Sequence, residues 1–185
     1  MARDAEATRK RLLDAAIAEF SARGIAGARV DRIADAAGCN KAMIYAYFGS
    51  KDGLFDAAVD ALFVDTLRDI PIDPDDLPGY TVELFDHYRA QPEGIRLLTW
   101  YRLERGELAE VPEAVANAHR DKIIAIKRAQ NDGRLPKDFP AEELLALVVN
   151  ISMIGVTHLG PQSDDPAAIK RHRRTVARAV RRLVR

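Results

Sequence analysis

The sequence contains few of the residue types that build catalytic or metal sites. Of its 185 residues, one is cysteine, four are histidine and 6% are aromatic. A single cysteine cannot form a disulfide within the chain, which suits a reducing compartment such as the cytoplasm. The histidines lie far apart and match no ligand spacing such as H-E-x-x-H, and the chain has no glycine-rich phosphate loop. We therefore expect no metal, no cofactor and no enzymatic activity.

Uninterrupted hydrophobic runs of membrane-spanning length are also missing. The segment 141–160, AEELLALVVNISMIGVTHLG, is long enough to span a membrane, but two glutamates, Asn150 and His158 interrupt it. We interpret it as a helix that is buried on most sides. The N-terminal MARDAEATRKR carries charges but no apolar stretch, so it does not resemble a signal peptide. The sequence thus predicts a cytoplasmic protein with no membrane partner.

The net charge of zero hides an uneven distribution. Residues 1–52 carry nine basic and seven acidic residues, whereas residues 53–169 carry 11 basic and 21 acidic ones. Residues 170–185 carry eight basic residues and no acidic one. An acidic middle section discourages non-specific contact between the body of the protein and nucleic acid. Any binding of nucleic acid should therefore be confined to the N-terminal part.

The basic end of the chain, KRHRRTVARAVRRLVR, allows two interpretations. It could be a second nucleic-acid surface, or an amphipathic helix whose basic side faces water. We favour the helix, because an apolar stripe runs along it at helical spacing. The stripe consists of Ile169, His172, Val176, Val180 and Leu183.

The clearest functional pattern is in residues 30–51, VDRIADAAGCNKAMIYAYFGSK. Its first four apolar residues, Val30, Ile33, Ala34 and Ala37, fall at i, i+3, i+4 and i+7, on one face of a short helix. Gly38 is suited to the left-handed conformation that ends such a helix sharply. The segment therefore begins with a helix of about two turns and a tight turn.

A second short helix is predicted over residues 41–47. The side chain of Asn40 can cap its start. Ile44 and Phe48, four residues apart, can pack inward, which leaves Lys41, Ala42, Tyr45 and Tyr47 for the outer face. A plain helical hairpin with solvated polar residues is the alternative, because helix–turn–helix units occur in many bundles. Two exposed tyrosines beside two lysines favour a helix that enters a DNA groove.

Residues 12–55 resemble the DNA-binding domain of the TetR (tetracycline-repressor) family of transcriptional regulators. The resemblance rests on Ala16, Phe20 and Gly24, on I-A-x-x-A-G from Ile33 to Gly38, and on Y-x-Y-F-x-x-K from Tyr45 to Lys51. It implies that Tyr47 and Lys51 touch phosphates, while Lys41, Ala42 and Tyr45 face the groove.

Two positions depart from the family's pattern. Arg29 stands where a capping threonine is common, so a helix cap is lost and a cation that could reach a phosphate is gained. Cys39 and Asn40 replace a common Val-Ser, and Asn40 can still cap the helix. Cys39 could sense redox state, but a small turn residue is the preferred interpretation. The expected DNA-binding residues are Arg29, Asn40, Lys41, Ala42, Tyr45, Tyr47 and Lys51.

The whole chain is expected to be all-α, with nine helices. The first should span about 5–23, the next two are those above, and the fourth, 51–69, should link the domains. Later helices are expected over 79–90, 93–107, 112–133, 140–160 and from Asp165 as N-cap with Pro166 first in the helix. We place a helix-turn-helix DNA-binding domain at 1–52 and a ligand-binding and dimerisation domain at 53–185.

The helix at 140–160 is apolar on more sides than one core requires. The simplest second packing partner is the same helix of another subunit, so we expect a two-fold homodimer. The TetR resemblance implies the same four-helix arrangement with the C-terminal helix. The expected interface residues are Leu147, Ile151, Ile154, Gly155, Val176, Val180 and Leu183.

The resemblance also implies a pocket for a small-molecule effector in the second domain. Aromatic and polar residues in these segments are the candidates, although aromatic residues at helical spacing also serve as core. They are Phe85, Tyr88, Trp100, Tyr101, His119, Asn150, Met153 and His158. The expected function is sequence-specific binding of a pseudo-palindromic double-stranded operator, with repression as the family's usual mode and release by the effector. An enzyme and a helical scaffold that no longer binds DNA are the competing classes.

Overall fold

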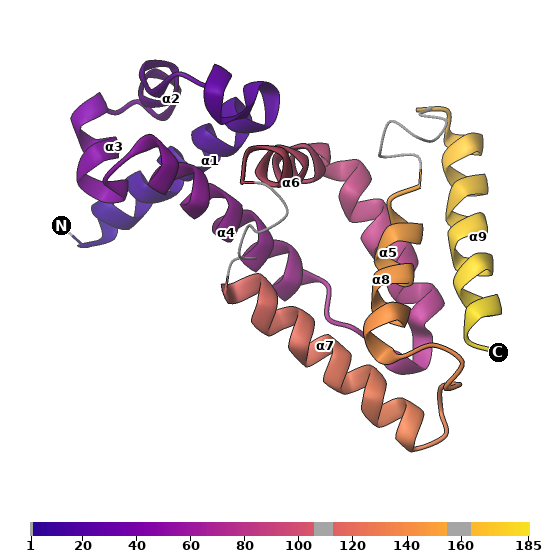
Figure 1. Cartoon of the computed structure of the whole chain (residues 1–185). Helices are drawn as coiled ribbons and strands as arrows, with labels where there is room; N and C mark the ends of the chain where they lie inside the picture. Colours follow the sequence, from indigo (N-terminus) through magenta and orange to yellow (C-terminus); the bar gives the residue numbers. More distant parts are fainter. Residues whose placement is uncertain (1, 106–112, 155–163) are drawn as a thin grey trace. The chain divides into compact units, whose positions relative to one another are not determined.

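The computed structural model describes residues 2–105, 113–154 and 164–185, and within these ranges all side chains except those of residues 2, 3, 63–69 and 113–115. The described residues form nine α-helices, one short 3-10 helix and no strand, which confirms the all-α prediction (Figure 1). The helices are α1 (Ala2–Gly27), α2 (Val30–Ala37), α3 (Lys41–Phe48), α4 (Lys51–Asp69), α5 (Leu77–Ala90), α6 (Pro92–Arg105), α7 (Glu113–Asn131), α8 (Ala141–Ser152) and α9 (Pro166–Leu183), with the 3-10 turn η1 (Pro74–Asp76) before α5.

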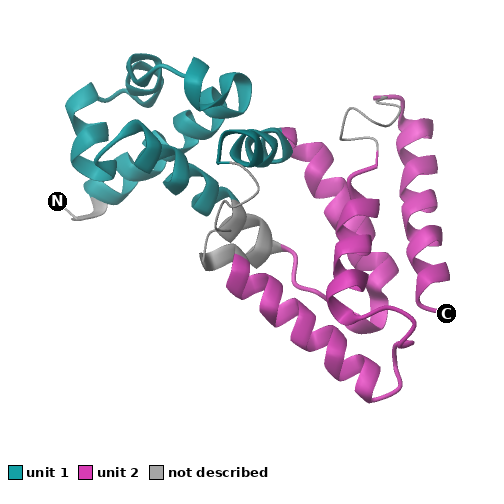
Figure 2. Ribbon diagram, viewed as in Figure 1, with its two compact units in different colours: residues 1–65, 93–115 teal, residues 66–92, 116–185 magenta. Residues whose placement is uncertain are grey.

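The chain divides into two compact units, coloured separately in Figure 2. Unit 1 contains residues 1–65 and 93–115, so α6 joins the first three helices and most of α4. Unit 2 contains residues 66–92 and 116–185. The chain therefore leaves unit 1 within α4, forms α5 in unit 2, and returns to unit 1 as α6.

Unit 1 is built around one apolar core. Phe20 of α1 meets Phe55 of α4 edge to face, with ring centroids 5.1 Å apart, an arrangement that aromatic rings favour. The apolar face predicted for α2 is buried here together with Leu12, Leu13 and Ala16 of α1, and α3 contributes Ile44. Leu97 of α6 is also fully buried in this cluster. Burial of the large apolar side chains is the main favourable contribution to the stability of this unit.

Local signals fix the ends of the short helices as predicted. Gly38 ends α2 in the left-handed conformation, with φ 63°. The Asn40 side chain accepts hydrogen bonds from the N–H groups of Ala42, at 2.6 Å, and Met43, at 3.3 Å. Ser50 caps α4 by accepting from the Gly53 N–H at 2.9 Å. The turn between α2 and α3 therefore begins at a left-handed glycine, Gly38, and ends at a capping residue, Asn40.

Unit 2 packs α5, α7, α8 and α9 around a second apolar core. Leu84 of α5, Ile126 of α7, Leu144 of α8 and Val180 of α9 belong to the same buried cluster. Figure 1 shows α5 running alongside α8 and α9. Asp165 caps α9 through the N–H groups of Ala167 and Ala168, as its position before a proline predicts.

The predicted helix ends depart most from the structure in the first and the eighth helix. The first helix continues past residue 23 to Gly27, because a further turn follows a break at Gly24. The eighth helix ends at Ser152, well before residue 160. Its last turn is tightened, with Met153 and Ile154 donating N–H groups to carbonyls three residues back. Residues 155–160 lie outside the described residues.

The break in α1 depends on glycine. Gly24 has φ 66° and ψ 179°, a region that only glycine adopts readily. An added Cβ would lie 2.7 Å from Cε3 of Trp100 on α6. The absence of a side chain at this position therefore permits both the bend and the close packing of α6.

We predict that Gly24→Ala lowers the free energy of unfolding by about 3 kcal/mol or more, since backbone strain and overpacking add. The control is Gly38→Ala, which also has positive φ but leaves its Cβ in open space. It should lose only the backbone contribution of about 1–2 kcal/mol. Urea unfolding of both variants measures the difference, and equal losses would contradict the packing role of Gly24.

Candidate nucleic-acid interface

The second short helix, α3, buries almost nothing on its outer face. Ile44 is its one fully buried residue, and Phe48 is half-buried against the core of unit 1. Tyr45 and Tyr47 expose 45% and 36% of their surface, which is high for aromatic residues. Lys41 and Ala42 are also exposed. The predicted inward and outward faces of α3 are therefore those found in the structure.

Two of the expected cations lie around one carboxylate. Nζ of Lys41 is 2.9 Å from Oδ1 of Asp31, and Nη2 of Arg29 is 4.0 Å from Oδ2. The hydrogen bond from the Lys41 ammonium lowers the pKa of Asp31, and the same contact raises the pKa of Lys41. The sequence analysis did not single out Asp31, which is the acidic residue of this face that contacts Lys41.

The tyrosine and lysine expected to touch phosphates occupy different surroundings. The Tyr47 hydroxyl donates to the carbonyl of Ala5 in α1, at 3.4 Å, so it is tied to the N-terminal helix. Arg9 of the same helix places its guanidinium 5.6 Å from the Phe48 ring centroid. Lys51 is half-buried in the first turn of α4. The N-terminal part of α1 thus lies beside the end of α3.

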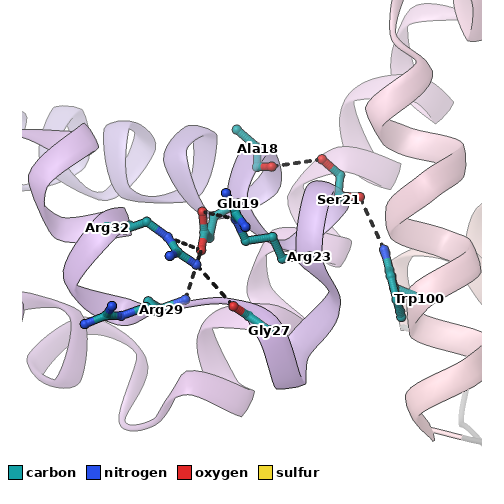
Figure 3. A network of polar contacts seen from close by, with 8 residues as sticks. All are labelled: Ala18, Glu19, Ser21, Arg23, Gly27, Arg29, Arg32 and Trp100. Atoms are coloured by element: carbon teal, nitrogen blue, oxygen red, sulfur yellow. Dashed lines mark hydrogen bonds and ion pairs between the residues drawn. The ribbon is translucent and has the colours of Figure 1, made fainter.

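A half-buried acid of α1, Glu19, contacts the start of α2 (Figure 3). Arg29 has no side-chain cap, but its N–H donates to Oε1 of Glu19 at 3.0 Å. Arg32 donates to the same oxygen through Nε at 2.8 Å, and Arg23 lies 3.5 Å from the other oxygen. Burial raises the pKa of Glu19, but these hydrogen bonds and charges outweigh it and lower the pKa. The cluster pins the start of α2 to α1.

The effector candidates are divided between the two units. Trp100 and Tyr101 belong to unit 1, where the indole N–H of Trp100 donates to the Ser21 carbonyl at 3.3 Å (Figure 3) and the Tyr101 ring stacks on Phe55. The other described candidates belong to unit 2: Phe85 is fully buried, Tyr88 and Met153 are half-buried, and His119 and Asn150 are exposed. His158 lies outside the described residues.

Unit 2 contains a buried lysine that sequence analysis missed. Lys122 of α7 is 7% exposed, and its ammonium donates to the Tyr80 hydroxyl at 2.7 Å and to the Ile70 carbonyl at 3.4 Å. Burial lowers the pKa of Lys122 to about 8. No carboxylate of the described residues forms an ion pair with it. The available signal was its place on the apolar face of α7, four and seven residues before Ile126 and Ala129.

The interface candidates also divide. Val176 and Val180 are completely buried inside the protomer, and Leu183 is half-buried against the same core. The expectation that these two valines contact a second subunit is wrong, because the stripe they belong to already packs within unit 2. Leu147 and Ile151 are half-buried, and Ile154 is 39% exposed. Gly155 lies outside the described residues.

None of the described helices is long and apolar enough to cross a membrane. The described residues also hold no group of three histidine, cysteine or acidic residues placed to bind a metal ion. Cys39 is half-buried in the turn, with its Sγ 3.4 Å from the Ala37 carbonyl.

We predict that the buried charge of Lys122 opposes folding at neutral pH. Because its pKa is about 8 in the folded state against 10.5 in the unfolded chain, the unfolded chain holds more protons in this window. The stability that Lys122 takes away should therefore return as the pH rises from 8 to 10.5, by up to about 3 kcal/mol. Lys122→Met should be more stable than the parent at pH 7 and lose this advantage by pH 10.5. Denaturant unfolding across this range is the measurement, and a difference independent of pH would contradict the argument.

Two family models match the chain. Residues 12–58 match one described as bacterial regulatory proteins, tetR family, and residues 76–182 match one described as tetracyclin repressor-like, C-terminal domain. The first match contains the whole of α2 and α3. The second contains α5 to α8 and nearly all of α9, so together the models cover most of the described structure.

Individual relatives agree with the family models. The chain is 45% identical over 150 residues to the HTH-type transcriptional repressor SCO4008 of Streptomyces coelicolor, which spans 80% of this chain and 78% of that protein. It is 33% identical over 112 residues to the HTH-type transcriptional repressor NicS of Pseudomonas putida, 57% of this chain and 53% of that one. The crystal structure of the putative transcriptional regulator SCO4942 from Streptomyces coelicolor superposes with a TM-score of 0.82 and 36% identity, covering 96% and 98% of the two chains. The chain belongs to the TetR family of DNA-binding transcriptional regulators.

Proposed function

We propose that this protein is a cytoplasmic repressor that binds a pseudo-palindromic DNA operator as a homodimer and leaves it when a small-molecule effector binds. The observation that carries the proposal is the outer face of α3. A helix capped at its start buries Ile44 and leaves a lysine and two tyrosines exposed. Folding alone does not require aromatic side chains at these positions, whereas DNA contact uses them. Two relatives are named as transcriptional repressors.

The proposed docking places α3 in the major groove. The groove is about 12 Å wide and admits an α-helix, and the small side chain of Ala42 allows close approach. Lys41 and Tyr45 then face the base edges, while Arg29, Tyr47 and Lys51 flank the phosphates. Asn40 acts indirectly, because its side chain is occupied in capping α3.

We predict that Lys41→Ala combined with Lys51→Ala weakens operator binding and flattens its salt dependence. Each lost phosphate contact reduces the slope of log K against log salt by about 0.9. The matched control is Lys127→Ala, which removes an exposed lysine of unit 2 that is paired with Glu142. Fluorescence anisotropy at several salt concentrations gives both quantities, and a double variant with the parent's affinity and slope would refute the docking.

The proposed dimer supplies the second recognition helix that a palindromic site requires. Two copies of α3 about 34–36 Å apart, or somewhat more, would read successive turns of one DNA face. The support is the outer side of α8 and the turn that follows it, where Leu147, Ile151 and Ile154 keep apolar surface exposed after the protomer core is complete. Its burial against a second copy is favourable, and a two-fold axis brings the same residues together from both sides.

We predict that Ile154→Asp converts the dimer to a monomer. The chain offers a close control in Ile124→Asp on α7, since Ile154 and Ile124 are 39% and 40% exposed. Both variants should keep a folded protomer, because neither residue belongs to a buried core. Sedimentation velocity at micromolar concentration should separate them; a parent protein that is already monomeric would exclude the proposed interface.

Release by an effector requires that the ligand bind one arrangement of the protein better than the other. We place its site in unit 2, where Phe85, Tyr88, His119, Asn150 and Met153 remain candidates, and where the C-terminal family model matches. The helices α4 and α6 support the coupling, because each is joined directly in sequence to unit 2 while packing in unit 1.

A further inference from the structure

The Asp31–Lys41 pair lies where a carboxylate is least expected. Both side chains are about half exposed, so mutual screening by water makes the pair a weak contributor to stability. Yet it joins the first turn of α2 to the first residue of α3 at 2.9 Å, on the face proposed to meet DNA. The Asp31 carboxylate there repels phosphates and so weakens DNA binding. A role for the pair in DNA binding must therefore come from another effect.

The Asp31–Lys41 pair can fix the direction in which the Lys41 side chain points. A free lysine is a flexible point charge that takes any phosphate within reach. The Lys41 ammonium has three N–H donors, of which the Asp31 carboxylate occupies one. Two donors remain, which matches the two acceptors, O6 and N7, that guanine presents in the major groove. The nearby Arg29, 4.0 Å from the other carboxylate oxygen, helps to hold Asp31 in place.

We propose that Asp31 is a positioning residue for sequence recognition: it holds Lys41 away from the phosphates and aims its remaining donors at base edges. Non-specific DNA then gains little from Lys41, while a site with a suitably placed guanine keeps the full contact. The consequence is a larger ratio of specific to non-specific affinity. This inference rests on the proposed function, because it requires α3 to be the helix in the groove.

The test is Asp31→Asn in the full-length protein. The specific probe is a duplex that the parent protein enriches from a random-sequence pool, and the non-specific probe is sheared salmon-sperm DNA. We expect affinity for the non-specific DNA to rise about three- to tenfold, with a salt slope steeper by about 0.9 as Lys41 takes a phosphate. Affinity for the enriched duplex should stay within about twofold or fall, and the variant should relax the preference at one base pair in a repeated selection.

Two further variants separate positioning from charge. Asp35→Asn removes the same charge from the same helix, at an exposed residue other than the one paired with Lys41, and should leave the affinity ratio unchanged. In a Lys41→Ala background, Asp31→Asn should no longer alter the salt slope, since the effect acts through the lysine. Equal rises in both affinities, or the same ratio change from Asp35→Asn, would overturn the positioning role.

The outcome also distinguishes the two proposals. If the parent protein enriches no sequence, the proposed function and this inference fail together. If it enriches a duplex and the Lys41 and Lys51 variants lose affinity for it, but Asp31→Asn keeps the parent's affinity ratio, the inference alone fails.

Discussion

The Glu19 carboxylate holds the start of α2 against α1, and the arrangement of the helix-turn-helix, α2 and α3, depends on this contact. Arg29 occupies the N-cap position of α2, but its side chain makes no cap hydrogen bond. Glu19 accepts from the Arg29 N–H and from the Arg32 guanidinium together. Because α2 is fixed in this way, the left-handed turn at Gly38 and the capped start of α3 follow at defined positions. An acid on α1 thus acts together with the apolar core to place α2, from which α3 follows.

The two units hold charged groups in opposite environments. In unit 1, the half-buried Glu19 contacts the guanidinium groups of Arg23 and Arg32 and the N–H of Arg29, so its charge is compensated and its pKa is lowered. In unit 2, Lys122 is surrounded by apolar residues, a hydroxyl and a carbonyl, so its charge is disfavoured. A compensated ion makes a local structure definite, whereas an uncompensated one leaves it poised between protonation states.

The features that sequence reasoning predicted well are those governed by neighbouring residues. The turn at Gly38, the caps Asn40 and Asp165, and the inward residue Ile44 depend on spacings of a few positions, and all were confirmed. The end of α8 at Ser152 was not predicted, because neither a glycine nor a proline stands at that position to indicate it.

Contacts between distant residues could not be inferred in the same way. Glu19 and Arg32 are 13 positions apart, and Trp100 lies 79 positions from Ser21. The periodicity of α9 correctly placed Val176 on a buried face, but it could not show whether the protomer or a second subunit covers that face. One stripe can serve a protomer core or an interface, and only tertiary packing decides between them. For the same reason the outward residues of α3 were predictable, but their pairing with Asp31 was not.

The placement of α6 in unit 1 makes the DNA-binding unit discontinuous in sequence. Its core needs Leu97 and Trp100, which the chain supplies only after it has built α5 in unit 2. A protein truncated before residue 92 would keep every residue of the helix-turn-helix, yet it would expose the side of α1 and α4 that α6 covers. During synthesis, unit 1 can therefore complete its core only when α6 has emerged, after α5. Segments of the two units therefore alternate along the chain. A transfer of the N-terminal segment to another protein would need to include α6.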